Sequence, residues 1–83
     1  MSIAAIRIAH RVANFFDEQG CDNIEVETND VTELRYTTPN GHLGSLTISK
    51  DGTMTERMGM DNGQPLEVIG TYRNMQQLRA AWM

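Results

Sequence analysis

The acidic side chains between positions 16 and 33 are the residues of this sequence whose chemistry stands out. The stretch FDEQGCDNIEVETNDVTE has no Lys or Arg and holds seven carboxylates: Asp17, Glu18, Asp22, Glu25, Glu27, Asp30 and Glu33. The other four acids and all seven basic residues lie elsewhere. The stretch therefore carries a formal charge of −7 and the rest of the chain +3, which together give the net charge of −4. The negative charge of the molecule is therefore concentrated on one segment.

These carboxylates admit three interpretations. They are an ordinary solvated surface if Glu25 and Glu27 alternate with buried residues on an edge strand, where charge also discourages aggregation. They are a binding face for a basic partner if their spacing of about 7 Å on a strand imitates the phosphates of a nucleic acid. Glu25 and Glu27 are a catalytic pair if they act as general acid and general base, since their spacing falls within the carboxylate separation of inverting glycosidases, about 6.5–9.5 Å. A short exposed strand offers no cleft to separate their pKa values, so the binding face is our functional hypothesis.

The other reactive residue types form no recognisable catalytic or metal-binding motif. Cys21 follows Gly20 at an expected helix C-terminus among acidic neighbours, which disfavours the thiolate and predicts a buried structural residue. His10 and His42 have neither each other nor Cys21 at a zinc-ligand spacing. No glycine-rich phosphate-binding loop is present. The sequence thus predicts no catalytic residue, no cofactor and no metal ion.

The composition predicts one folded domain over residues 1–83, since 40% of the residues are hydrophobic. A single cysteine excludes an internal disulfide, which favours a reducing, cytoplasmic location, or the host-cell cytoplasm if a phage encodes the protein. No signal-peptide pattern opens the chain, and no apolar run approaches the roughly 20 residues that cross a bilayer. The negative net charge argues against direct binding to nucleic acid or to an anionic membrane.

The elements that must position the acidic stretch begin with an amphipathic helix over residues 2–19. Ser2 is its expected N-cap, and Gly20 its expected C-terminal stop. At 100° per residue its apolar residues share one face, which comprises Ala5, Ile6, Ile8, Ala9, Val12, Ala13, Phe15 and Phe16. The opposite face is polar and carries Arg7, Arg11, Asn14 and Glu18. The helix should therefore cover a sheet.

The segments that follow alternate between apolar and polar residues, as strands with one buried face do. We expect strands over residues 23–28, 32–38, 43–49 and 53–60, and a further short one over 66–70. The side we expect to be buried carries Ile24, Val26, Leu34, Tyr36, Leu46, Ile48, Met54, Met58 and Met60. The uncovered side carries Glu25, Glu27, Glu33, Arg35, Thr37, Thr47, Thr55 and Arg57. Short links rich in Asn, Asp and Gly favour sequential antiparallel pairing.

The last segment, TYRNMQQLRAAW over residues 71–82, predicts a second helix. Thr71 is its expected N-cap, and its apolar stripe consists of Tyr72, Met75, Leu78 and Trp82. The predicted fold is an α+β two-layer sandwich in the order α-β-β-β-β-α. It contains an antiparallel meander of three to five strands, with the N-terminal and C-terminal helices on one face.

This element order resembles that of the double-stranded RNA-binding domain, which runs α-β-β-β-α. That family contacts phosphate through a Lys-rich start of its second helix, whereas the matching segment here, VIGTYRNMQQ, has one Arg and no Lys. The resemblance therefore does not extend to RNA binding. In size and charge the chain is similar to the small acidic anti-restriction and anti-CRISPR inhibitors of phages and mobile elements.

From these features we predict a non-enzymatic intracellular protein-binding module, an inhibitor or adaptor. Its seven carboxylates would contact a basic, nucleic-acid-handling protein. A structural module that assembles as a homodimer or larger homo-oligomer, through an edge strand or the methionine-bearing face, is the first alternative. A small-molecule binder or enzyme is the second, and it requires a concave pocket with convergent polar groups.

Overall fold

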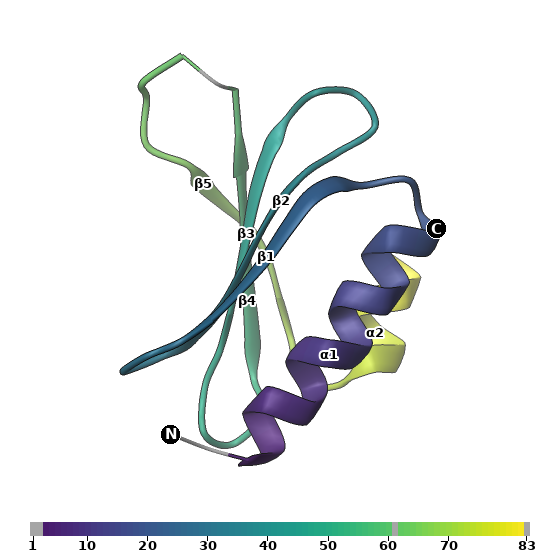
Figure 1. The fold of residues 1–83 in the computed structure, drawn as a ribbon, viewed down its shortest axis with the longest axis vertical. Helices are drawn as coiled ribbons and strands as arrows, with labels where there is room; N and C mark the ends of the chain where they lie inside the picture. Colours follow the sequence, from purple (N-terminus) through teal and green to yellow (C-terminus); the bar gives the residue numbers. More distant parts are fainter. Residues whose placement is uncertain (1–2, 61, 83) are drawn as a thin grey trace.

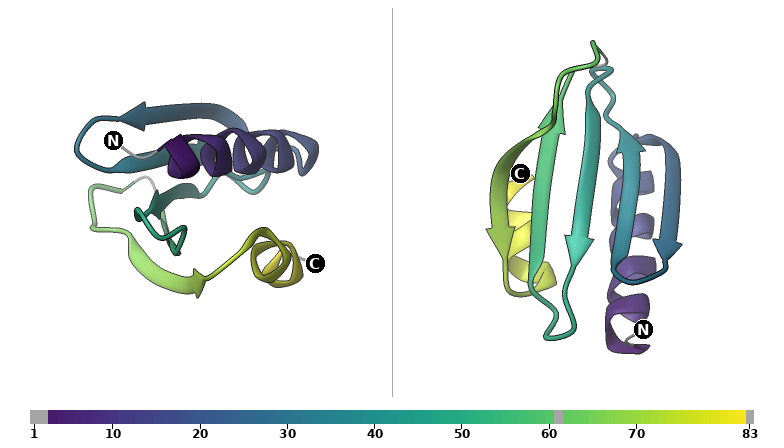
Figure 2. Two further views of the ribbon diagram at one scale, coloured as in Figure 1. Left: turned by 90° about the horizontal axis from the view of Figure 1, so that it is seen from below. Right: turned by 90° about the vertical axis from the view of Figure 1, so that its left-hand side faces the viewer.

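The computed structural model of this chain describes residues 3–60 and 62–82, with two helices on one face of a five-stranded sheet (Figures 1 and 2). The elements are α1 (Ile3–Glu18), β1 (Asp22–Thr28), β2 (Thr32–Thr37), β3 (Leu43–Ile48), β4 (Met54–Gly59), β5 (Glu67–Tyr72) and α2 (Met75–Ala81). Every strand pairs antiparallel with its neighbour in the sequence, in the order β1-β2-β3-β4-β5. The predicted α+β sandwich, with an antiparallel meander and both helices on one face, is confirmed.

The first helix packs its predicted apolar face on β1, β2 and β3. Its buried residues are Ala5, Ala9, Val12, Phe15 and Phe16. The residues predicted for its polar face are all exposed, namely Arg7, Arg11, Asn14 and Glu18. Phe16 is fully buried, which contributes about 2–3 kcal/mol to the free energy of unfolding. Ser2, the expected N-cap, lies outside the described residues.

The helix ends as predicted at Gly20, whose φ of +89° lies in the left-handed region that glycine adopts without strain. The Gly20 N–H donates to the carbonyl of Asp17 at 3.1 Å, and the Cys21 N–H donates to that of Phe16 at 3.0 Å. These two bonds form a Schellman motif, which satisfies carbonyls that the helix leaves unpaired. The motif turns the chain directly into β1, within the acidic stretch.

The helix-covered side of the sheet holds most of the residues predicted for it. Five are buried: Leu34, Tyr36, Leu46, Ile48 and Met54. Three are partly buried against this core: Ile24, Val26 and Met58. The prediction for Met60 is wrong, because β4 ends at Gly59 and the Met60 side chain is 56% exposed beyond it.

The boundary between the last strand and the last helix differs from the prediction. Thr71 and Tyr72 extend β5, where they pair with Thr55 and Met54, so Thr71 is not a helix cap. Asn74 caps α2 instead, and its Oδ1 accepts a hydrogen bond from the Gln77 N–H at 2.9 Å. Both differences have physical reasons, because β-branched and aromatic residues favour strands and Asn is the stronger N-cap.

An aromatic cluster joins the two helices above the sheet. Trp82, the C-cap of α2, stacks on Phe16 of α1 with ring centroids 4.5 Å apart. Phe15 approaches the same indole edge-on at 6.1 Å, and Tyr36 of β2 lies 4.3 Å from Phe16. The short second helix is thus held by its last aromatic residue, which also reaches the sheet below.

Candidate functional site

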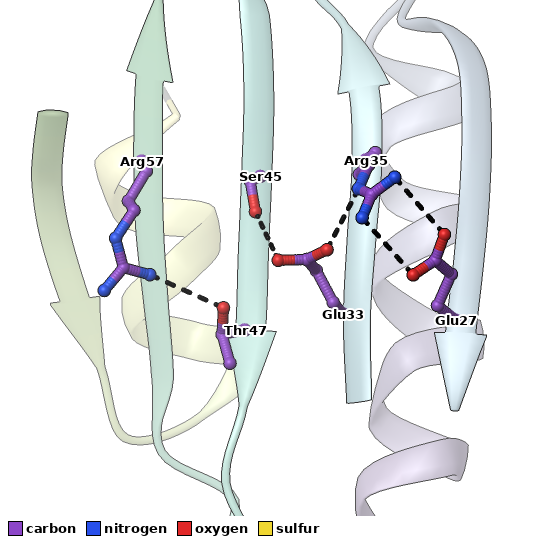
Figure 3. Close-up of polar contacts among 6 residues, drawn as sticks. All are labelled: Glu27, Glu33, Arg35, Ser45, Thr47 and Arg57. Carbon is purple, nitrogen blue, oxygen red and sulfur yellow. Dashed lines mark hydrogen bonds and ion pairs between the residues drawn. The ribbon is translucent and has the colours of Figure 1, made fainter. Parts of the chain in front are cut away.

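The open face of the sheet carries a polar network centred on Arg35 of β2 (Figure 3). The Arg35 Nε donates to Oε1 of Glu33 at 3.0 Å, and its two terminal nitrogens lie 3.3 Å from the two carboxylate oxygens of Glu27 on β1. Ser45 of β3 donates to the other Glu33 oxygen at 3.1 Å. Because Glu27 and Glu33 are direct cross-strand partners, Arg35 holds together two carboxylates that would otherwise repel each other.

The seven predicted site residues belong to the end of α1, to β1, to the β1–β2 turn and to β2, elements that lie at one edge of the molecule (Figure 2, right). Asp17 and Glu18 end α1, and Asp22 opens β1. Asp30 lies in the β1–β2 turn, at the far end of the strand. The remaining three, Glu25, Glu27 and Glu33, lie on the open face of β1 and β2. The acidic stretch therefore forms a band, which we call the acidic edge.

Most of the acidic edge has no internal counter-charge. Within residues 3–60 and 62–82, ion pairs involve only Arg35 with Glu27 and Glu33. The other five carboxylates have no ion pair there: Asp17, Glu18, Asp22, Glu25 and Asp30. Asp17 and Glu18 also stand at the negative end of the α1 dipole, whose last turn holds no basic residue. Within the described residues, no ion pair offsets the repulsion among these five carboxylates.

A second polar feature, which sequence reasoning missed, lies on the helix-covered side. Although Glu56 of β4 is a glutamate, its side chain is only 1% exposed and belongs to the core. Its carboxylate accepts hydrogen bonds from the hydroxyl of Tyr36 at 2.5 Å, the hydroxyl of Tyr72 at 2.8 Å and Nε1 of Trp82 at 3.1 Å. A signal in the sequence could have found it, because position 56 has the same strand parity as the buried Met54 and the partly buried Met58.

Two glycines allow the tyrosines to reach this carboxylate. Tyr36 pairs across the strands with Gly44, and a Cβ added at Gly44 would stand 2.2 Å from the Tyr36 ring. Tyr72 lies in the same way over Gly70, where an added Cβ would stand 2.3 Å from the hydroxyl oxygen. Each ring therefore lies against bare backbone, which brings its hydroxyl to Glu56.

The surroundings of Glu56 are neutral donors and apolar rings, with no ion pair to it within the described residues. Burial, together with the hydrogen bond to Glu56, raises the pKa of Tyr36 far above its ordinary range. The same causes raise the pKa of Tyr72 to about 12. Burial and the nearby Glu56 and Asp22 raise the pKa of the Cys21 thiol. The predicted buried position of Cys21 is confirmed.

The two tyrosines predict a loss of stability at alkaline pH. In the unfolded chain they ionise near pH 10, whereas in the folded chain Tyr72 ionises near pH 12 and Tyr36 higher still. The folded state keeps protons that the unfolded state releases, so the free energy of unfolding falls as the pH rises above about 10. For Tyr36 the slope is about 1.4 kcal/mol per pH unit.

Urea denaturation at a series of alkaline pH values measures this slope. Tyr36→Phe removes one of the two groups, so its slope above about pH 10 should be shallower by the same amount. Equal slopes for the wild type and the variant would show that Tyr36 ionises in the folded chain as it does in the unfolded one.

Comparisons with known proteins add no relative, since no protein-family model, curated protein or solved structure matches this chain. Among residues 3–60 and 62–82, no three His, Cys, Asp or Glu side chains lie together as metal ligands would. His10 is exposed on α1 and His42 is partly buried before β3. In the same described part of the chain, neither helix has the length and apolar character needed to cross a membrane.

Proposed function

We propose that this protein is a non-enzymatic protein-binding module whose acidic edge contacts a basic surface on a nucleic-acid-handling partner. The observation that carries this proposal is the set of five carboxylates on the acidic edge without an ion pair in the described chain. Uncompensated charge of one sign lowers the stability of the folded chain through self-repulsion. A partner with a positively charged surface would relieve this repulsion and be attracted by the same charge.

The geometry of the edge suits such a partner. β1 is an outer strand, so one side of its backbone pairs with no other strand of the sheet. Arg35 fixes the Glu27 and Glu33 carboxylates in place, which reduces the conformational entropy lost when they are bound. Glu25, the cross-strand neighbour of Arg35, extends this fixed pair along β1. A guanidinium-rich surface would meet carboxylates at both ends of β1.

An inhibitor of a nuclease or of another nucleic-acid-binding complex is the form of partner binding that we favour. Such complexes present basic surfaces to phosphate, and a row of carboxylates competes for the same surface. The small size and lopsided charge match those of the anti-restriction and anti-CRISPR inhibitors. We place the protein in a reducing cytoplasm, the host's if a phage encodes it, where a single free cysteine is ordinary.

Affinity capture from lysate of the native host, followed by mass spectrometry, tests this proposal. The bait is compared with the double variant Glu25→Gln/Asp30→Asn, which removes two charges from the acidic edge. The matched control, Asp51→Asn/Glu67→Gln, removes two charges from elsewhere on the surface. The expected result is a partner that the wild type and the control retain and the edge variant loses.

Binding of the purified partner then gives the magnitude. We expect the edge variant to bind at least about tenfold more weakly, and the affinity of the wild type to fall steeply with salt. A partner that binds both double variants equally well would contradict a role for the acidic edge.

Self-association through β5 is the second candidate function. β5 is the other outer strand, and its consecutive residues Val68 and Ile69 are 56% and 54% exposed. Both are exposed because the pairing of β4 with β5 shifts register between Glu56 and Arg57, which leaves Ile69 as an extra residue. Sedimentation equilibrium at micromolar concentration separates the candidates. A monomer excludes this assembly, whereas a dimer that persists in high salt supports it.

A further inference from the structure

A cavity of about 350 Å³ opens on the helix-covered side of the sheet, beside the C-terminal end of α2. Its polar wall is Glu56, and its aromatic walls are Tyr72 and Trp82. Met58 and Ile69 line it with apolar surface. It lies on the opposite side of the sheet from the Arg35 network, so what it binds does not depend on the acidic edge.

The carboxylate that lines this cavity has no cationic partner among the described residues. Three donors engage Glu56 through four hydrogen bonds: the hydroxyls of Tyr36 and Tyr72 donate to one oxygen each, and the Trp82 indole N–H lies 3.1 and 3.4 Å from the two oxygens. These bonds match the roughly four lone-pair positions of a carboxylate. All three donors are neutral, and no basic side chain of the described residues forms an ion pair with Glu56. The site is therefore built around a buried carboxylate whose hydrogen bonds all come from neutral donors, so its charge would act on a cation through its field.

We propose that this cavity binds an organic cation that carries an alkylammonium group. The ammonium charge would be attracted by Glu56, whose field is weakly screened because the group is buried. Tyr72 and Trp82 line the cavity, and aromatic rings attract cations by cation–π interaction. The alkyl part would pack on Met58 and Ile69, and the volume falls in the range of small-molecule sites.

Trp82 is the single tryptophan of the chain, so its fluorescence reports on the cavity without a label. The full chain is titrated with butylammonium chloride, and in parallel with 1-butanol at an ionic strength matched with sodium chloride. We expect a saturable change with butylammonium, and binding of 1-butanol at least about tenfold weaker. Equal responses to the cation and the alcohol, or no saturable change with the cation, would overturn the proposal.

A pair of matched variants tests the location. Ile69→Lys places an ammonium group at the cavity wall, where it competes with the ligand, whereas Val68→Lys adds the same charge at the neighbouring exposed position outside the cavity. We expect Ile69→Lys to weaken butylammonium binding at least about tenfold and Val68→Lys to change it less than about twofold. Equal effects of the two variants would overturn the site.

Glu56→Gln tests the charge itself, with circular dichroism to confirm that the variant folds. The folded variant should bind butylammonium at least about tenfold more weakly than the wild type does. A folded variant that binds as tightly would show that the carboxylate attracts nothing. If Glu56→Gln does not fold, the comparison of Ile69→Lys with Val68→Lys decides the proposal.

Discussion

Glu56→Ala is expected to lower the free energy of unfolding by about 3–5 kcal/mol. The truncation leaves the hydroxyls of Tyr36 and Tyr72 and the indole N–H of Trp82 without their acceptor. It also leaves a void in the sheet–helix interface, where the Glu56 side chain is 1% exposed. Urea denaturation followed by circular dichroism measures the loss.

Glu67→Ala is the matched control for this prediction. Glu67 is an exposed glutamate at the start of β5 with no ion pair in the described structure, so its truncation should change the free energy of unfolding by less than about 0.5 kcal/mol. Glu56→Gln keeps the shape and one acceptor oxygen, and it should fall between the two alanine variants. A loss for Glu56→Ala no larger than that for Glu67→Ala would mean that the carboxylate is not part of the core.

Gly44→Ala is expected to lower the free energy of unfolding by about 2–4 kcal/mol, although it adds only one methyl group. The added Cβ would stand 2.2 Å from the Tyr36 ring, so the ring must leave its place against the β3 backbone. Its hydroxyl then loses Glu56, and its contact with Phe16 at 4.3 Å is disturbed. The same denaturation experiment measures this change.

Gly59→Ala provides the comparison for Gly44→Ala. Both glycines occupy strands, but a Cβ at Gly59 meets the flexible end of the Leu66 side chain at 2.9 Å, which can move aside. Its loss should therefore stay below about 1 kcal/mol. If Gly44→Ala acts by removing the hydroxyl from Glu56, its effect should also shrink in a Glu56→Gln background. If the losses of the two variants are strictly additive, Gly44→Ala does not act through the hydrogen bond between Tyr36 and Glu56.

The elements of this fold were predictable where one local pattern decided them. The 3.6-residue period places Val12 and Phe16 on the buried face of α1. The two-residue period places Leu34 and Leu46 on the buried face of the sheet, and the structure shows both pairs buried. The prediction from apolar spacing was wrong for Thr71 and Tyr72. The three-residue spacing of Tyr72 and Met75 is that of a helix, yet Tyr72 is the last residue of β5 and Met75 the first of α2. Only the pairing of Tyr72 with Met54, which depends on the register of β4, decides between strand and helix.

The polar cluster could not be assembled from the sequence in the same way. Glu56 shares the strand parity of Met54, but sequence reasoning did not place it in the core, because a buried glutamate needs donors and its donors come from β2, β5 and the end of α2. These contacts span 20, 16 and 26 residues, so no window of the sequence contains them. The acidic edge was visible as composition, whereas the Arg35 pairing that fixes part of it depends on strand register.

The two outer strands of this sheet differ in a way that limits polymerisation. β1 borders the sheet with carboxylates, and β5 borders it with Val68 and Ile69. Two copies that joined β5 to β5 about a twofold axis would form one continuous ten-stranded sheet with a like-charged border at both ends. A third copy would meet only repelling borders, so growth into filaments would stop at the pair.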